Sequence, residues 1–232
     1  MSVTVVMPVY NEKNYILEIV KRVVDTGIPD ELVIVDDFSR DGTGDILKKM
    51  KDGWKDPGCV VKVIFQEKNM GKGAALRRGF REVSGDIVIV QDADLEYDPK
   101  DYPKLLAPIL DGRADVVFGS RFLGETHRVL FFWHMVGNKT LTFFSNILSN
   151  LNLSDMETCY KAFRADVLKK ITLTSDRFGF EPEFTAKAAK ARCRIYETSI
   201  SYAGRTYEEG KKINWKDGVA AFWHILRFNL FP

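Results

Sequence analysis

Four short apolar runs, separated by stretches with helical spacing, fill the first 90 residues of this 232-residue chain. Between the runs, apolar residues recur three or four positions apart, as they do in helices that pack one face on a core. Strands and helices that alternate in this way are typical of βαβ units, which place mostly parallel strands between layers of helices. The sequence therefore predicts an α/β fold with strands at Val3–Met7, where Pro8 is expected to stop the strand, and at Leu32–Val35, Val60–Phe65 and Asp86–Val90.

Pairs of acidic residues follow two of these strands. Asp36 and Asp37 end the second strand, and Asp92 and Asp94 follow the fourth. Because α/β sheets bind ligands beyond the carboxyl ends of their strands, both pairs are expected at one edge of the sheet. Mg²⁺ and Mn²⁺ are usually held by one or two carboxylates together with water and substrate phosphates. The spacing therefore favours a metal-diphosphate site, with a turn at Asp92 and a helix cap at Asp94 as the simpler alternative.

A glycine-rich loop follows the third strand and should open onto the same edge. Gly71 and Gly73 let the backbone approach an anion closely, so Lys72 is either a donor-phosphate ligand or a solvated lysine. The loop does not match a Walker motif, because Gln66 stands where the first glycine is needed and Gly73 where Ser or Thr belongs. No Gly-x-Gly-x-x-Gly follows the first strand either, which argues against a dinucleotide-binding fold.

Composition and charge narrow the class of partner. With 45% hydrophobic and 28% charged residues, the chain is typical of a soluble globular protein with one main core. A net charge of +2 gives no electrostatic case for nucleic acid as a partner. Cys59, Cys159 and Cys193 are widely spaced, which favours a reducing compartment and argues against structural zinc. We expect neither a secretion signal nor a membrane span, since no run reaches about 18 apolar residues.

The second half continues the alternation of strands and helices and then becomes poor in charged residues. A helix is expected from Asp98 to Leu110 and a strand at Asp115–Phe118, before a stretch from Val129 to Leu153 that carries few charges. The last helix is either packed on the core or lies at a membrane interface as an amphipathic helix. The later elements expected are a strand at Ala162–Arg164, a helix opening at Gly179–Glu183, a strand at Arg194–Tyr202, a polar segment from Arg205 to Lys212 and a last helix from Trp215 to about Phe228.

Six motifs then occur in the order found in one enzyme family. Together they resemble family 2 glycosyltransferases with the GT-A fold, and within them the dolichyl-phosphate mannose synthase-like and bactoprenol glucosyltransferase-like branch. The resemblance implies a Rossmann-like nucleotide-diphospho-sugar transferase fold with a mixed, mostly parallel central sheet flanked by helices. The matching pieces are Pro8–Glu12, Val35–Thr43, Asn69–Gly73, Asp92–Leu95, Gly119–Phe122 and the set Arg205, Gly210 and Lys212.

The resemblance implies that the acidic edge binds a nucleotide-sugar donor. Asp36 and Asp37 would accept hydrogen bonds from the base or ribose, and Tyr10 would stack on the base. Asp92 and Asp94 would hold Mg²⁺ or Mn²⁺, which stabilises charge on the departing nucleoside diphosphate. The nucleotide-sugar site so implied contains Pro8, Tyr10, Glu12, Asp36, Asp37, Lys72, Asp92, Ala93, Asp94, Arg205 and Lys212, with Glu96 or Gln91 helping to hold the metal and with Arg205 and Lys212 closing over the diphosphate.

In this branch the acceptor is the phosphate of a polyprenyl lipid, which Arg121 would bind through two parallel hydrogen bonds. A phosphate monoester has a second pKa of about 6, so it is largely ionised at neutral pH and needs no strong base. Asp155 is the candidate for orienting the acceptor or accepting a residual proton, and Glu157 is the next choice. Further candidates for the acceptor phosphate are Arg128, His134 and Lys139, while Glu181 and Glu183 are either helix-start acids or acceptor-site groups.

The resemblance therefore implies a metal-dependent, inverting glycosyltransferase that moves mannose or glucose from GDP-mannose or UDP-glucose to dolichyl or undecaprenyl phosphate. Residues 1–212 would form the catalytic domain and residues 213–232 a C-terminal amphipathic helix, on the cytoplasmic face of a membrane. The alternatives are transfer to a saccharide or other non-lipid acceptor and a non-catalytic nucleotide-sugar-binding module. The expected catalytic residues are Asp92, Asp94, Asp155 and Arg205.

Overall fold

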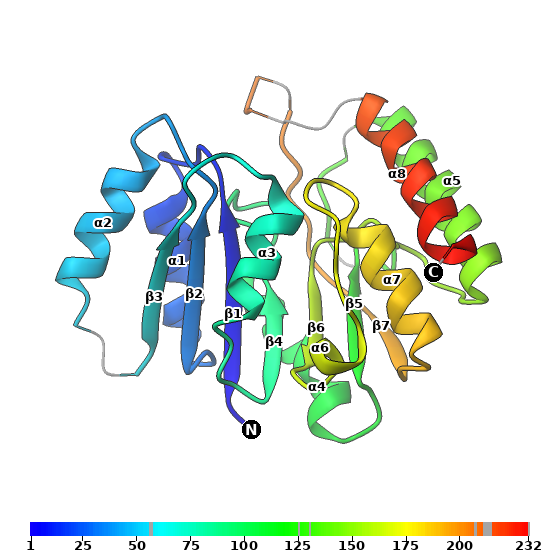
Figure 1. Ribbon diagram of the computed structural model, residues 1–232, viewed down its shortest axis with the longest axis horizontal. Helices are drawn as coiled ribbons and strands as arrows, with labels where there is room; N and C mark the ends of the chain where they lie inside the picture. The colour runs from blue at the N-terminus through cyan, green and yellow to red at the C-terminus, as the bar shows by residue number, and fades with distance from the viewer. Residues whose placement is uncertain (56–57, 125, 130, 207, 211–214, 232) are drawn as a thin grey trace.

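Seven strands form one sheet in the computed structural model, which describes residues 1–55, 58–124, 126–129, 131–206, 208–210 and 215–231 (Figure 1). The strands are β1 (Val3–Val9), β2 (Glu31–Asp36), β3 (Val60–Phe65), β4 (Ile87–Val90), β5 (Val116–Ser120), β6 (Lys161–Arg164) and β7 (Ile195–Ser199). Their order is β3-β2-β1-β4-β6-β5-β7. All neighbours are parallel except β6, which runs antiparallel to β4 and β5. The predicted α/β class and mixed, mostly parallel sheet are confirmed.

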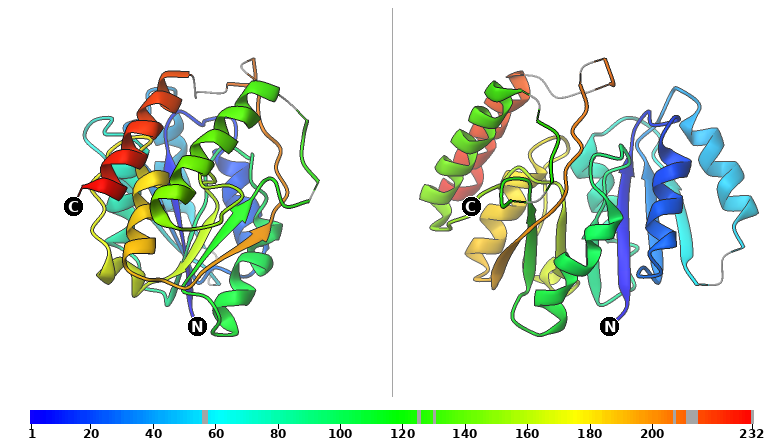
Figure 2. Two further views of the ribbon diagram at one scale, coloured as in Figure 1. Left: turned by 90° about the vertical axis from the view of Figure 1, so that its right-hand side faces the viewer. Right: turned by 180° about the vertical axis from the view of Figure 1, so that it is seen from behind.

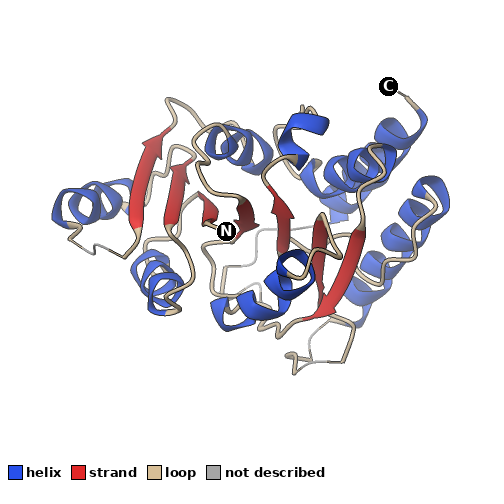
Figure 3. Ribbon diagram, turned by 90° about the horizontal axis from the view of Figure 1, so that it is seen from below, coloured by secondary structure: helices blue, strands red, loops and turns tan. Residues whose placement is uncertain are grey.

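Helices cover both faces of this sheet (Figure 3). One core lies under α1 (Ile16–Asp25), α2 (Thr43–Gly53) and α4 (Tyr102–Leu110). The other lies under α3 (Lys72–Phe80) and α7 (Phe180–Lys190), with the short α6 (Val167–Lys170) at its margin. A 3-10 turn, η1 (Pro99–Asp101), precedes α4 and is capped by Asp98. The alternative in which Asp94 caps the next helix is therefore wrong.

β1 extends two residues beyond its predicted end. Pro8 was expected to stop the strand, but it pairs in register with Val35 of β2. On the β4 side the last pair is Val6 with Val90, and the Val6 carbonyl accepts a bond from Gln91. The nitrogen of Pro8 faces this same side, where β4 has already ended. The missing N–H of proline therefore removes no hydrogen bond from the sheet.

Two long helices, α5 (Phe132–Ser149) and α8 (Trp215–Leu230), lie side by side at one end of the molecule, next to α7 (Figures 1 and 2). The rings of Phe144 and Phe222 join them edge to face at 5.2 Å. Ile225 of α8 is buried in the second core, so this helix packs on the protein along one side. Within the described part of the chain, no helix is both long enough and apolar enough to cross a membrane.

Candidate active site

The loops after β1 and β2 are joined by hydrogen bonds at the carboxyl edge of the sheet. The backbone N–H of Glu12 donates to Thr43 Oγ1 at 3.0 Å, and Glu12 itself is buried. Asp36 is buried and accepts a 2.5 Å bond from Ser39 Oγ, and burial raises the pKa of its carboxyl group. Tyr10 lies beside them and is 36% exposed, which leaves one ring open to solvent at the position predicted to stack on a base.

Asp37 holds the loop that follows β3. Its carboxylate accepts hydrogen bonds from Gln66 Nε2 at 2.7 Å and Asn69 Nδ2 at 3.0 Å, and from the backbone N–H groups of Met70 and Gly71 at 2.7 Å each. A carboxylate with this many donors orders the loop and orients Gly71 toward α3. The predicted contact of Asp37 with a base or ribose stays a prediction, and the base or ribose would have to share this carboxylate with the four donors.

Lys72, the first residue of α3, reaches back to the end of β4. Its Nζ lies 2.9 Å from Asp92 Oδ1, 3.2 Å from Glu181 Oε1 and 2.7 Å from Cys159 Sγ. Burial disfavours the charged form of this lysine, but the two carboxylates and the sulfur outweigh burial and raise its pKa well above the ordinary value. Of the two interpretations of Lys72, the solvated lysine is therefore wrong.

The glycines around Lys72 are required by a close approach of two loops. Gly71 has φ +98°, and a Cβ there would lie 2.5 Å from the carbonyl oxygen of Asp176. A Cβ on Gly73 would clash with the carbonyl of Ser175. Arg77 of α3 binds the same segment through Ser175 and Asp176. The start of α3 is thus pressed against the loop before α7, which brings Lys72 to Glu181.

Arg205 occupies a second cluster of acids. Its Nη2 lies 2.9 Å from Asp94 Oδ2, its Nη1 lies 3.3 Å from Glu12 Oε2, and its Nε lies 3.4 Å from Glu96 Oε1. Burial, together with the charges of Asp92 and Glu96, raises the pKa of Asp94 to about 7 in spite of this arginine. The structure therefore brings Asp94, Glu96 and Arg205 together, and it pairs Asp92 with a different cation.

These residues fit a divalent cation that arrives with a diphosphate. Carboxylate oxygens are the preferred ligands of Mg²⁺ and Mn²⁺, and Asp94 lies near two further carboxylates, those of Asp92 and Glu96, which add to the effect of burial in raising its pKa. No group of three acidic, histidine or cysteine side chains in the described ranges is arranged to enclose a metal by itself. Mg²⁺ is typically held by one or two carboxylates plus substrate phosphates rather than by an all-protein cage. Asp94 and Glu96 would hold such an ion, with Asp92 beside them.

Arg121, just after β5, is fixed by Asp155. Its Nε and Nη2 each donate to that carboxylate at 2.7 Å, and its backbone N–H donates at 3.1 Å. Asp155 is fully buried, and its attraction outweighs burial and raises the pKa of the guanidinium. The guanidinium also lies 5.3 Å above the ring of Tyr202, whose hydroxyl donates to Glu96 at 2.7 Å. One tyrosine therefore contacts both the predicted acceptor arginine and the predicted metal site.

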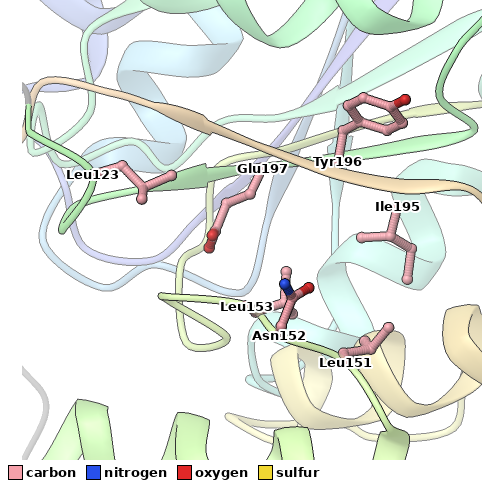
Figure 4. Close-up of a pocket in the computed structure, with 7 residues that line it drawn as sticks. All are labelled: Leu123, Leu151, Asn152, Leu153, Ile195, Tyr196 and Glu197. Atoms are coloured by element: carbon pink, nitrogen blue, oxygen red, sulfur yellow. The ribbon is translucent and has the colours of Figure 1, made fainter.

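A surface cavity of about 250 Å³ lies between the edge strand β7 and residues 151–153 (Figure 4). Its wall includes Glu197, whose carboxylate accepts bonds from the backbone N–H groups of Ser154 and Asp155. Burial raises the pKa of Glu197. The cavity adjoins the backbone that supports Asp155 and contains none of the predicted donor-site residues.

The other predicted acceptor groups lie at different distances from Arg121. Lys139 of α5 lies 4.5 Å above the ring of Phe122, next to Arg121. Arg128 instead pairs with Glu209 at 2.7 Å and donates to the Gly204 carbonyl. The ring of His134 packs against that of Phe131 at 5.1 Å with a tilt of 40°. Ala93 is buried beside the acids, Pro8 lies in β1, and Lys212 lies outside the described residues.

Sequence reasoning missed two members of the site. Cys159 and Tyr202 were not predicted, because each belongs to an element far from the acids in the chain and neither forms part of a charged motif. For Glu181 two interpretations were left open, and its contact with Lys72 favours a role in the site. Glu183 binds Thr174, Ser175 and Lys187, so it supports the start of α7. The position of Cys159 between Asp155 and β6 is a sequence feature that could have identified it as part of the site.

Two curated proteins are similar in sequence to this chain over most of its length. An undecaprenyl-phosphate mannosyltransferase from Micrococcus luteus is 30% identical over 259 residues, with 99% of each chain covered. A dolichol-phosphate mannosyltransferase from Pyrococcus furiosus is 29% identical over 216 residues, which cover 91% of this chain and 59% of that protein. These relatives match the branch named from the sequence motifs.

The fold is shared with a solved enzyme. Glucosyl-3-phosphoglycerate synthase from Mycobacterium tuberculosis, crystallised with Mn²⁺, UDP and glucosyl-3-phosphoglycerate, superposes with a TM-score of 0.75 at 19% identity. The match covers 100% of this chain and 81% of that one, and it shows the GT-A fold. A model of the family described as glycosyl transferase family 2 matches residues 4–172. The chain therefore belongs to glycosyl transferase family 2 and is a glycosyltransferase.

Proposed function

We propose that this glycosyltransferase moves a hexose from a nucleotide sugar, GDP-mannose or UDP-glucose, to the phosphate of a polyprenyl lipid, dolichyl or undecaprenyl phosphate. The observation that carries the proposal is the contact of Tyr202 with both Glu96 and Arg121. It sets a guanidinium suited to a phosphate next to acids suited to a metal diphosphate. The names of the M. luteus and P. furiosus relatives support the same acceptor class.

The donor is proposed to bind across Asp94 and Lys72. Bound Mg²⁺ or Mn²⁺ would stabilise negative charge on the leaving diphosphate. Arg205 and Lys72 supply further positive charge from within the protein, and both are already held at the acids by ion pairs. The Mn²⁺ and UDP-glucose in a crystal of the M. tuberculosis enzyme support this chemistry for the shared fold. Tyr10 is proposed to stack on the base.

The acceptor phosphate is proposed to bind Arg121. Asp155 uses one side of the guanidinium, and the remaining N–H groups on Nη1 and Nη2 are free to donate to phosphate oxygens. An ionised phosphate oxygen attacks the anomeric carbon as the bond to the donor diphosphate breaks. No proton has to move, so Asp155 acts as a positioning residue. A single displacement of this kind inverts the anomeric centre.

A membrane would deliver such an acceptor. Exposed apolar residues recur at helical spacing on both α5 and α8, which lie side by side (Figure 2). Such a pair of faces is larger than the scattered apolar residues of an ordinary surface. We propose that it rests in the interface of the cytoplasmic leaflet, with residues 213–232 as an appendage of a catalytic domain at 1–212. This α5–α8 apolar face consists of Phe132, Phe143, Ile147, Val219, Trp223 and Leu230.

The test is transfer of labelled sugar into the organic phase. Purified protein would be incubated with Mg²⁺ or Mn²⁺, undecaprenyl or dolichyl phosphate, and GDP-mannose, UDP-glucose or UDP-GlcNAc in turn. Lipid-soluble label from one donor, lost on treatment with EDTA, is the expected result. No label from any donor, despite metal-dependent nucleotide binding, would contradict the proposal and direct attention to saccharide acceptors.

A further inference from the structure

A five-residue segment connects the two halves of the site. At one end, Asp155 binds Arg121. At the other end, Cys159 lies 2.7 Å from Lys72, which is paired with Asp92. Four peptide units span at most about 14 Å between Cα atoms, so the residue that binds the acceptor arginine and the residue that contacts the donor-site lysine are separated by no more than that. The segment therefore borders both the donor site and the acceptor site.

Glu157 is the midpoint of the segment and has an unsatisfied atom. Its Oε1 is buried and has no hydrogen-bond partner among the described residues. Buried polar atoms in folded proteins are nearly always hydrogen-bonded, and an exception calls for a ligand or a water. A side chain that is left unpaired between a donor site and an acceptor site is positioned to meet the group that is transferred.

The surroundings of Glu157 favour the neutral acid. Burial and the neighbouring Glu181 raise its pKa to about 8, Lys161 and Arg121 oppose this, and Asp155 adds to it. Below that pH the carboxyl group carries one O–H donor and one C=O acceptor. This pair of groups matches a sugar hydroxyl, which both donates and accepts. A neutral acid is a poor base, and the ionised acceptor phosphate needs none.

We propose that Glu157 is a specificity-determining residue that hydrogen-bonds one hydroxyl group of the donor hexose. The inference rests on the proposed function, because it places the sugar between Asp92 and Arg121. It differs from the role predicted from sequence, in which Glu157 was second choice for handling the acceptor. A site built around such a hydroxyl rejects a sugar that lacks it, because the carboxyl is then left unpaired.

The experiment measures donor binding by titration calorimetry with Mn²⁺ present, using whichever of GDP-mannose and UDP-glucose binds more tightly and its analogues that lack one hydroxyl at a time. For the natural protein, one deoxy analogue should bind about 10- to 100-fold more weakly than the full donor, the cost of one buried hydrogen bond. In Glu157→Leu, the affinity for the full donor should fall by a similar factor, and the affinity for that deoxy analogue should not fall further. Glu157→Gln, which keeps one donor and one acceptor, should discriminate as the natural protein does.

Two further measurements separate recognition from folding. Glu183→Gln is the matched control, since Glu183 is a fully hydrogen-bonded glutamate of the same region; it should lower the melting temperature and leave the ranking of the analogues unchanged. Glu157→Leu should not lower the melting temperature, because it removes an unsatisfied polar atom. Donor affinity of the natural protein should also fall as the pH rises through about 8, whereas that of Glu157→Gln should not.

The inference is overturned if Glu157→Leu binds the full donor normally, or if it still discriminates among the analogues as the natural protein does; the buried oxygen would then be satisfied by water alone. Loss of melting temperature in Glu157→Leu with unchanged ranking would also overturn it. Because binding is measured without acceptor, these outcomes hold even if no lipid is glycosylated. Failure of transfer with normal discrimination would count against the acceptor assignment only.

Discussion

The donor edge, which is the carboxyl edge of the sheet that carries the acids of the proposed donor site, differs from the α5–α8 apolar face in whether its binding groups already have partners. At the donor edge, the acids Asp37, Asp92 and Asp94 are each bound by groups of the protein itself. On the α5–α8 apolar face, large side chains are exposed, with Trp223 at 57% and Phe132 at 62%. Binding at the first region must exchange partners that already exist, whereas binding at the second covers surface that is open. The first region should respond to loss of a charge even when the shape of the side chain is kept, and the second to loss of apolar area.

The largest effect is expected at Asp94. Asp94→Asn keeps the shape of the side chain but removes a charge that would hold the metal, so turnover should fall by roughly 100- to 1,000-fold. Initial rates of lipid-linked product formation would measure this. Because burial beside Asp92 and Glu96 raises the pKa of Asp94, the variant should melt no earlier than the natural protein. Turnover within tenfold of normal would show that the metal does not depend on the charge of Asp94 at the donor edge.

Arg121 should come next, since it is bound at the boundary between the two regions. Arg121→Lys keeps the charge but loses the two parallel hydrogen bonds, so KM for the lipid phosphate should rise by about 10- to 100-fold. The KM for the nucleotide sugar is the internal control and should stay the same. An equal rise in both constants would show that Arg121 supports the fold of the site rather than the acceptor.

The glycine next to Lys72 tests how tightly the donor edge is packed. Gly73→Ala puts a methyl group onto the Ser175 carbonyl and should destabilise the protein by about 2 kcal/mol, measured by urea unfolding. Gly53→Ala, at the end of α2, has open space around it and should change stability by a few tenths of a kcal/mol at most. If both variants unfold alike, the close approach of α3 to the loop before α7 is wrong.

The smallest effect is expected on the apolar face, because one side chain is a fraction of the covered area. Trp223→Ser should weaken binding to anionic vesicles by about tenfold in a flotation assay, given roughly 1.5–3 kcal/mol for burial of a large apolar side chain. Leu17→Ser removes an equally exposed apolar residue from α1 and should bind vesicles normally. An equal loss of vesicle binding in both variants would indicate nonspecific hydrophobic adsorption instead of a defined membrane face.

The sequence predicted the sheet well because each strand of the first half is a continuous apolar run. The local sequence pattern is sufficient to predict such elements, because a short continuous apolar run is typical of a strand that is covered on both faces. The same pattern placed Asp36 and Asp92 at the ends of their strands, as found. Pro8 failed as a stop signal because its effect depends on where the neighbouring strand ends, which no local rule reports.

The pairing of charges could not be predicted from the sequence. Lys72, Asp92, Cys159 and Glu181 come together only because β6 runs back antiparallel beside β4 and α3 packs on the loop before α7. The division of the two acids, Asp92 to Lys72 and Asp94 to an arginine more than 100 residues later, follows from that tertiary arrangement. Motif resemblance identified the residues, while their partners required the fold.

We propose that an ionised lipid phosphate, held by Arg121, is the nucleophile. The most direct test compares a polyprenyl phosphate with the polyprenol of the same length, each presented in the same detergent with the active donor and Mn²⁺. We expect a mass-spectrometric product with the phosphate alone, because the alcohol offers Arg121 no anion and would first have to lose its proton. Equal product from the alcohol would show that the phosphate is not the nucleophile.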